Sequence, residues 1–264
     1  MRFLALSLLT PFLLVNICFA QTIDVKPSQP AGVPLYRPAL VGSGPDALIN
    51  RIDAQELVKN GQKDALIMFT CTVIKTGDVV WSASYRGTPN SKLLEQELFK
   101  KLTGAKFIPA IYNRVPVDAI FYGTVTFAVI EGKPRLRIFS NQEAEELKKE
   151  SDFVGPQPFF GNESKFNGWH YPPKSEAPLE INGAVELALE VTEKGFVSNV
   201  SVAAEEPPFV GFGDAAAHDI GRARFIPAFS GGKPIACKVT LPVYFKHKDE
   251  VFNAELFPKT GNGE

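Results

Sequence analysis

Histidine and serine are the residue types whose spacing in this chain could indicate metal binding or catalysis. The three histidines, His170, His218 and His247, are scattered, and none stands in a spacing such as H-x-x-x-H that would bring two imidazoles to one metal ion. Ser230 precedes two glycines, but it lacks the strand-turn-helix context of a nucleophile elbow. The sequence therefore predicts a protein that is not an enzyme and that uses no metal and no cofactor.

Carboxylates gather near the middle of the chain and are the other candidates for chemistry. Glu143, Glu145, Glu146 and Glu150 are interspersed with lysines, as expected for the solvated face of a helix over residues 141–152. We therefore predict that these carboxylates face solvent and take no part in a reaction.

Composition and net charge limit the classes of partner. The 264 residues are 45% apolar and 22% charged, and the formal net charge is −1. These values are typical of a globular protein, and the balanced charge indicates no basic patch of the kind that nucleic-acid binders use. We expect no nucleic acid and no anionic membrane surface as a partner, and the sequence implies no small-molecule substrate.

The N-terminus has the pattern of an export signal. Arg2 is followed by a mostly apolar run from Phe3 to Val15, and Ala20 precedes the first polar residues of the next segment. A short basic start, an apolar core and a small residue at the cut are typical of a secretory signal peptide. We predict that residues 1–20 are a signal peptide and that the protein is exported. An uncleaved membrane anchor formed by the same residues is the alternative.

One phrase occurs twice and organises the rest of the chain. Residues 105–110 read AKFIPA and residues 223–228 read ARFIPA, at an offset of 118 positions. The same offset pairs further identical residues, among them Val73 with Val191, Gly77 with Gly195, Val79 with Val197, Pro116 with Pro234, Val125 with Val243 and Phe127 with Phe245. Similarity at a fixed period indicates a repeated structural unit, so we predict two tandem domains.

Each repeat has the residue pattern of a β-hairpin, a helix and a long last strand. In the first repeat we predict strands at residues 66–74, 79–85 and 117–130, a partner strand at 136–139 and a helix at 91–102. In the second we predict strands at residues 184–192, 196–203 and 235–245 and a helix at 214–220. The predicted fold class is therefore α+β, with two tandem two-layer domains that each pack a small antiparallel sheet on a helix.

The remaining segments connect or flank the two domains. The predicted organisation is a Pro-rich linker at residues 21–46, a first domain at 47–140 that opens with a helix at 47–60, a linker at 141–168, a second domain at 169–247 and a flexible tail at 248–264.

Two cysteines, Cys71 and Cys237, would remain after signal cleavage. An exported pair can form a disulfide. However, the offset places Leu189 opposite Cys71 and Ala119 opposite Cys237, so neither repeat keeps the cysteine of the other. We favour two buried thiols.

A series of short motifs crosses the second repeat in a fixed order. It starts with Tyr171-Pro172 and a Gly-x-Val at Gly183, and it continues with a glycine turn and a Val-x-x-Val-x-Val strand from Val197. An Arg-Phe-x-Pro element, a Gly-x-Pro turn and an apolar strand that closes at Phe245 follow. In this order and spacing, the motifs resemble the C-terminal domain of TonB-type energy transducers. The first repeat resembles it more weakly, because it lacks the Tyr-Pro entry.

The resemblance implies a non-enzymatic domain of the periplasm or cell envelope that grips an extended peptide of a partner protein. In TonB-type proteins the partner is an outer-membrane receptor, whose peptide adds as a strand to the sheet edge. The unpaired backbone groups of an edge strand suit this mode of binding. We expect the edge at residues 238–246. The partner-binding residues that the resemblance implies are Trp169, His170, Tyr171, Lys238, Thr240 and Val243.

Departures from the family pattern leave two alternatives open. Energy transducers keep an uncleaved anchor with polar coupling residues and a long spacer. Here the apolar N-terminus has no His, Asp or Glu, and the spacer at residues 21–46 is short. The alternatives are a membrane-anchored energy transducer of the TonB type and a structural envelope protein that uses its domains to form a homodimer.

Overall fold

The computed structural model describes residues 32–172 and 181–245. The chain divides into two units, Met1–Val33 and Pro34–Glu264, and the arrangement given below is that of the second unit alone. The predicted signal peptide at residues 1–20 and the predicted tail at 248–264 lie outside the described residues. Among the helices of the described part, none is both long and apolar enough to span a membrane.

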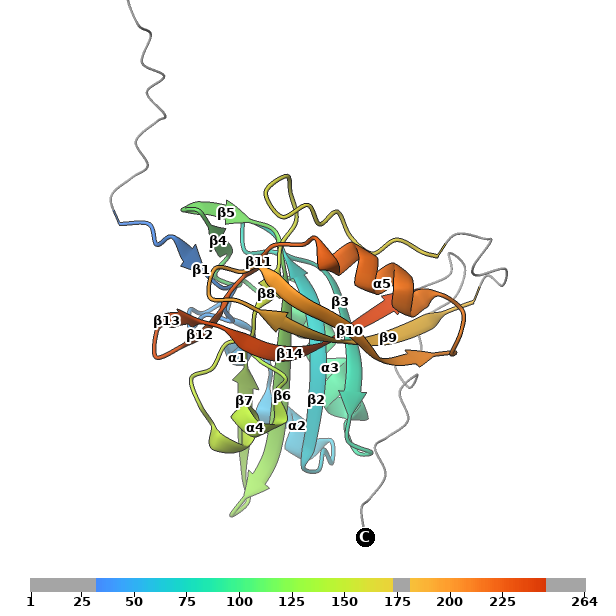
Figure 1. Ribbon diagram of the computed structural model, residues 1–264. Coiled ribbons are helices and arrows are strands. Elements are labelled where there is room, and N and C mark those ends of the chain that lie inside the picture. Colours follow the sequence, from blue (N-terminus) through green and yellow to red (C-terminus); the bar gives the residue numbers. More distant parts are fainter. Residues whose placement is uncertain (1–31, 173–180, 246–264) are drawn as a thin grey trace, which may run out of the picture. The chain divides into compact units, whose positions relative to one another are not determined.

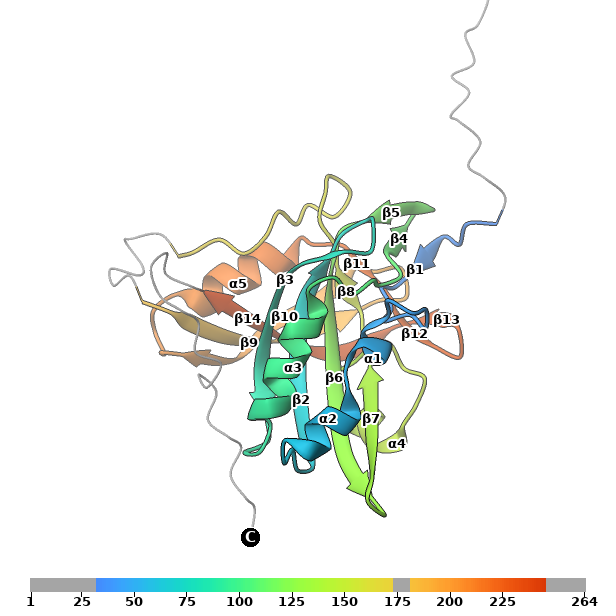
Figure 2. The same ribbon diagram turned by 180° about the vertical axis from the view of Figure 1, so that it is seen from behind.

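The first half of this unit contains a four-stranded antiparallel sheet with the strand order β3-β2-β6-β7 (Figures 1 and 2). Its strands are β2 (Ala65–Val73), β3 (Val79–Gly87), β6 (Ala119–Ile130) and β7 (Lys133–Phe139). Helix α3 (Lys92–Leu102) turns Leu94 and Leu98 into a core that also contains Phe69 and Phe121. The helix has this buried stripe because its leucines recur at helical spacing.

Short elements complete the first half. β1 (Tyr36–Arg37), β4 (Ala110–Tyr112) and β5 (Val115–Val117) form a small sheet in the order β1-β4-β5. The prediction of one helix at residues 47–60 is wrong, because the structure has two, α1 (Leu48–Arg51) and α2 (Ala54–Lys59). The break occurs where the Asp53 carboxylate accepts the N–H of Glu56 at 2.9 Å and so caps a new helix.

The second half contains a three-stranded antiparallel sheet with the order β10-β9-β14. Its strands are β9 (Gly183–Val191), β10 (Val197–Glu206) and β14 (Cys237–Phe245), and α5 (Phe212–Gly221) packs against β10 and β9. Two smaller pairs join β12 (Ala228–Ser230) to β13 (Lys233–Ile235) and β11 (Phe225–Ile226) to β8 (Gln157–Pro158). The predicted α+β fold class is confirmed.

Corresponding elements of the two halves are related by the offset of the repeated phrase. The bounds of β2 and β9 differ by 118 residues at both ends, as do those of β4 and β12 and those of β5 and β13. The strands β3 and β10, and likewise β6 and β14, begin at the same offset. The order β3-β2-β6 in one sheet therefore corresponds to β10-β9-β14 in the other. The correspondence supports a duplication, which itself stays a prediction.

The repeated phrase packs on the glycine turn of the hairpin in both halves. The N–H of Phe107 donates to the C=O of Gly77, and the N–H of Phe225 donates to the C=O of Gly195, each at 2.9 Å. The glycines have φ angles of 85° and 75°. A Cβ would lie 2.2 Å from the Phe107 oxygen at Gly77 and 1.9 Å from the Phe225 oxygen at Gly195. Only glycine fits both the backbone angle and the close approach, which explains why the turn and the phrase recur together.

Parts of the predicted linkers are packed into the folded unit. Ala39, in the predicted linker at residues 21–46, donates its N–H to Gln157 Oε1 at 2.7 Å and accepts from Gln157 Nε2 at 3.0 Å. Gln157 is buried and belongs to the predicted linker at 141–168, which also contains α4 (Ala144–Lys149). Proline disfavours regular structure but does not prevent packing, so composition alone misses these contacts. The domain boundaries stay predictions.

The two halves share a core. Tyr85, Ile120 and Tyr122 of the first sheet are buried in the hydrophobic cluster of the second half. Arg86 on β3 also forms an ion pair with Glu186 on β9. As a result, the second sheet crosses β2, β3 and β6 in both ribbon views (Figures 1 and 2). The strand β14 therefore lies beside residues of the first half.

Candidate functional site

β14 lies at the edge of its sheet, where the sequence predicts partner binding. It pairs with β9 from Cys237 opposite Val191 to Phe245 opposite Gly183. Among the described residues no strand pairs with its other side. In an antiparallel pair, the backbone groups of alternate residues point toward the neighbouring strand and away from it. Thr240 belongs to the outward set, because both its N–H and its C=O bond to side chains outside the sheet.

Two side chains from the first half cover the backbone of Thr240. Gln142 Nε2 donates to the C=O of Thr240, and the N–H of Thr240 donates to Glu143 Oε1 at 3.2 Å. The hydroxyl of Tyr85 donates to Gln142 Oε1 and so orients the amide. We call Gln142 and Glu143 the edge cap. It satisfies both groups through which Thr240 could pair with an added strand.

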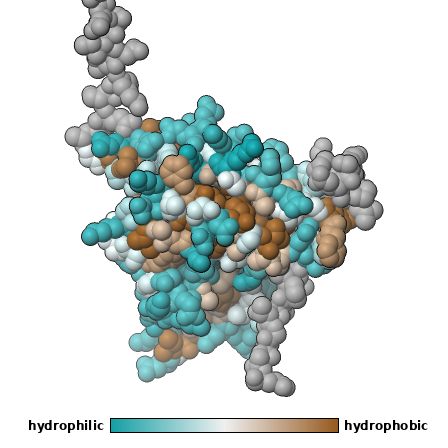
Figure 3. All heavy atoms as spheres, in the orientation of Figure 1, coloured by the Kyte–Doolittle hydropathy of each residue, from teal (hydrophilic) through white to brown (hydrophobic). Residues whose placement is uncertain are grey.

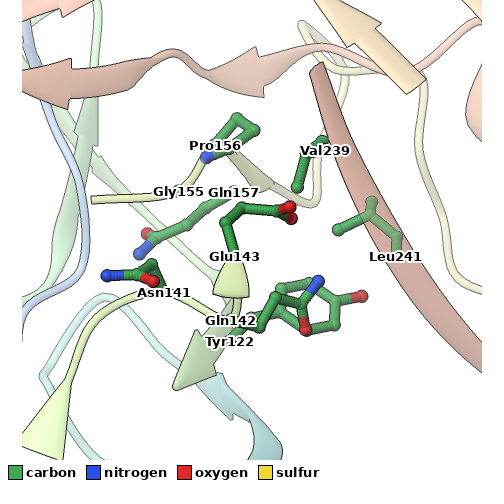
Figure 4. Close-up of a pocket in the computed structure, with 9 residues that line it drawn as sticks. All are labelled: Tyr122, Asn141, Gln142, Glu143, Gly155, Pro156, Gln157, Val239 and Leu241. Carbon is green, nitrogen blue, oxygen red and sulfur yellow. The ribbon is translucent and has the colours of Figure 1, made fainter. Parts of the chain in front are cut away.

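Glu143 is half-buried, which corrects the prediction that its carboxylate faces solvent. Burial raises the pKa of the Glu143 carboxyl, while the hydrogen bond from Thr240 and the charge of Arg86 act in the opposite direction. Figure 4 shows its side chain extended toward the stretch of β14 that carries Val239 and Leu241, across a small cavity. Glu143 therefore lies at the strand edge, whereas Glu145 and Glu150 are exposed as predicted and Glu146 is half-buried.

The other predicted binding residues of β14, Lys238 and Val243, differ in whether their backbone groups point outward. Lys238 is on the outward set, and its Nζ pairs with Glu190 at 3.0 Å with the lysine side chain 84% exposed. Pro242, also outward, has no N–H to donate. Lysine and proline are residues that protect an edge strand from uncontrolled pairing. Val243 is buried opposite Val185, and by the same alternation its N–H points toward β9.

Tyr171 helps to close the core of the second half. Its ring packs edge-on against Phe212, with the centroids 5.4 Å apart, and against Phe245 at 6.3 Å. Its hydroxyl donates to the C=O of Ile181 at 2.6 Å and accepts the N–H of the same residue at 3.0 Å. Phe245 is five residues beyond Thr240, or about 17 Å along a strand. The entry motif and the edge cap therefore lie at different places along β14.

Trp169 and His170 lie beside α5. The Asp219 carboxylate accepts the backbone N–H of His170 at 2.7 Å and lies 3.0 Å from its Nδ1. The ring of Trp169 packs edge-on against Phe166 at 5.0 Å. Their predicted contact with a partner stays a prediction.

Cys71 and Cys237 carry free thiols. Cys71 is fully buried, and burial raises the pKa of its thiol; burial also raises the pKa of the half-buried Cys237 to about 12. Within the described part of the chain, no group of three or more His, Cys, Asp or Glu side chains could hold a metal ion.

A comparison with protein families finds a match in the second half of the chain. Residues 169–247 match the family model described as Gram-negative bacterial TonB protein C-terminal. The match confirms the resemblance for less than a third of the chain. TonB C-terminal domains are protein-interaction domains of the periplasm or envelope, and outer-membrane receptors are among the proteins they interact with. The comparison with curated proteins finds no match.

The edge cap lies outside the matched residues and is a feature that the sequence does not reveal. Gln142 lies 98 residues before Thr240, in a segment whose composition is typical of a linker and a solvated helix. Neither glutamine nor glutamate carries a signal for such a contact. The one hint in the sequence is the position of these residues between the two repeats. A segment that connects two interacting domains can lie beside the edges of both.

Proposed function

We propose that this protein is a non-enzymatic envelope protein whose TonB-like domain binds an extended segment of a partner protein by strand addition to β14. The proposed partner is an outer-membrane receptor of TonB-dependent transport. We further propose that residues 47–140 are a divergent copy of the same domain. The family match at residues 169–247 supports a protein-binding role.

The observation that carries strand addition is the position of β7 in the first half. β7 pairs antiparallel with β6, from Thr124 opposite Phe139 to Ile130 opposite Lys133, on the side of β6 away from β2. At the offset of 118, this side of β6 corresponds to the outward side of β14. The pairing of β7, the hairpin partner of β6, on the corresponding edge supports the proposal that the outward side of β14 can take a further strand.

The test changes the backbone of Thr240. Thr240→Pro removes the outward N–H and leaves the ladder between β14 and β9 intact, and the outward Pro242 shows that the strand accommodates proline at such a position. We expect capture of an outer-membrane receptor from an envelope extract to fall at least about tenfold, since the central hydrogen bond of the added strand is lost. The captured proteins are identified by mass spectrometry.

Two variants control this experiment. Thr240→Val keeps the N–H and is expected to capture as the unchanged protein does. Val243→Pro removes an N–H within the ladder and is expected to lower the free energy of unfolding by about 3 kcal/mol, so its capture and its stability should fall together. Equal capture by Thr240→Pro and the unchanged protein would refute strand addition at this edge.

A further inference from the structure

The edge cap occupies the backbone groups that an added strand would need. We propose that Gln142 and Glu143 are an internal ligand of β14, which keeps the binding edge closed until a partner strand displaces them. This inference rests on the proposed function, because it assigns a regulation to the same site. It concerns a contact within the chain, and it can therefore be tested without the partner.

The geometry of the cap imitates a paired strand. A neighbouring strand would accept the N–H of Thr240 and donate to its C=O. Glu143 supplies the acceptor and Gln142 supplies the donor. Tyr85 fixes the direction of the amide, because its hydroxyl donates to Gln142 Oε1 and leaves the amide nitrogen to face the strand.

The cap can open without unfolding the segment that carries it. Asn141, immediately before it, is buried, donates through Nδ2 to the C=O of Phe153 at 3.0 Å, and accepts from Thr124 Oγ1 at 2.8 Å. Gln142 and Glu143 are only half-buried. With the backbone held at Asn141, rotation of these two side chains is enough to free the N–H and the C=O of Thr240.

The strength of the cap suits displacement. Two side-chain hydrogen bonds hold it to the strand, and each shifts an equilibrium by about twofold to tenfold. A partner strand that pairs along several residues makes more backbone bonds than the cap does. Of the other outward positions, Lys238 is charged and Pro242 has no N–H, so Thr240 offers the central N–H and C=O of this edge.

The direct test is amide hydrogen exchange at Thr240 in the full chain. In the double variant Gln142→Ala/Glu143→Ala, we expect exchange at Thr240 to accelerate at least about fivefold, because the N–H loses its acceptor. Exchange at Val239 and Leu241, whose N–H groups face β9, should stay unchanged. The matched control is Glu145→Ala/Lys148→Ala, which removes an exposed ion pair of α4 and should leave all three amides as they are.

A second measurement asks whether the opened edge accepts a strand. The probe is a synthetic peptide that copies β7, residues 133–139, because β7 pairs with the strand that corresponds to β14. We expect it to bind the double variant at least about fivefold more tightly than the unchanged protein, measured by fluorescence anisotropy. Should the double variant not fold, Gln142→Glu tests the same contact, since it places a carboxylate against the C=O of Thr240.

The outcomes separate the cap from the proposed function. Faster exchange confined to Thr240, together with tighter peptide binding, supports both. Faster exchange at Thr240 without tighter binding supports the cap and counts against strand addition. Unchanged exchange at Thr240 overturns the cap whatever the peptide does. Equal acceleration at Val239 and Leu241 also overturns it, because the side chains would then serve only to hold the sheet together.

Discussion

The outward edges of β6 and β14 correspond in the repeat, yet they are closed in different ways. β6 is paired with β7 over seven residues, by backbone hydrogen bonds that form part of a continuous sheet. β14 is covered at Thr240 by two side chains. A strand can leave a sheet only by breaking its whole ladder, whereas side chains can rotate away singly. The difference agrees with the proposal that partner strands bind at the second edge and not at the first.

One continuous stretch of chain closes both edges. β7 ends at Phe139, and the edge cap follows at Gln142 and Glu143. Apolar side chains, in brown, lie along the middle of the face that carries the second sheet (Figure 3). The half-exposed Phe196 and Val202 belong to this sheet and its hairpin. Two neighbouring segments of the first half therefore cover the corresponding edges of both sheets.

The largest effect is expected from breaking the turn that the two halves share. Gly77→Ala and Gly195→Ala should each lower the free energy of unfolding by about 3 kcal/mol, since each adds a Cβ at positive φ and against a backbone oxygen. Urea denaturation measures the loss. Gly132→Ala is the control, because Gly132 has a φ of 74° but no atom within 4 Å of the added Cβ, and it should cost about 1 kcal/mol.

The proposed equivalence of the two turns is contradicted if either variant lowers the free energy of unfolding by no more than Gly132→Ala does. It is also contradicted if the losses for Gly77→Ala and Gly195→Ala differ from each other by more than either differs from the loss for Gly132→Ala. Equal losses would show that the same close approach restricts both hairpins.

The helices and strands could be predicted because the spacing of apolar residues along the sequence indicates which face of each element is buried. The hairpins around Gly77 and Gly195 and the last strands were found in this way, and β14 was expected at residues 235–245 and runs from Cys237 to Phe245. The contact of Gln142 with Thr240 could not be predicted. Periodicity describes a single element, whereas an edge is closed by whatever lies beside it in three dimensions.

Hydrogen bonds of polar side chains also determine features of the fold that the pattern of apolar residues does not predict. The spacing of apolar residues at 47–60 is compatible with one helix or two, and the carboxylate of Asp53 selects two by capping the second. Ala39 and Gln157 are buried partners in segments that composition assigns to linkers. In each case a hydrogen bond between polar groups overrides the signal that hydrophobicity gives.

A smaller effect is expected in the pH dependence of stability, which should have opposite signs for a carboxylate beside β14 and one beside β7. Burial raises the pKa of Glu143, so the folded protein binds its proton more readily than the unfolded chain does. Stability therefore falls as the pH rises from the unfolded pKa of Glu143 through its folded value. Near β7 the sign is reversed, because hydrogen bonding to Arg137 lowers the pKa of Glu150. That contribution is present above the unfolded pKa of Glu150 and is lost as the pH falls through the folded value.

The pair Glu143→Gln and Glu150→Gln tests this reversal. Urea denaturation between about pH 4 and pH 8 should show that Glu143→Gln is more stable than the unchanged protein at neutral pH, by less than about 1 kcal/mol. Glu150→Gln should be less stable at the same pH. If both variants shift stability in the same direction, the carboxylate of the edge cap does not experience the burial that the structure shows.

The smallest effect concerns the basic residue of the repeated phrase. In the first half, Lys106 Nζ pairs with Asp78 Oδ1 at 2.5 Å on the surface. In the second half, the guanidinium of Arg224 lies over the ring of Phe196, 3.5 Å from its centroid. The offset of 118 relates both pairs, so one position uses an ion pair where its counterpart uses a cation–π contact.

The two contacts should respond differently to salt. Lys106→Met should cause a small loss of stability that fades as the ionic strength rises, since ions screen exposed charges within about 10 Å at 0.1 M. Arg224→Met should lower stability by about 0.5–1 kcal/mol at every salt concentration, because the guanidinium lies directly on the ring. Thermal denaturation across a salt series compares them. A loss at Arg224 that fades like that at Lys106 would mean that the aromatic ring contributes nothing and that both halves use a simple surface charge at this position.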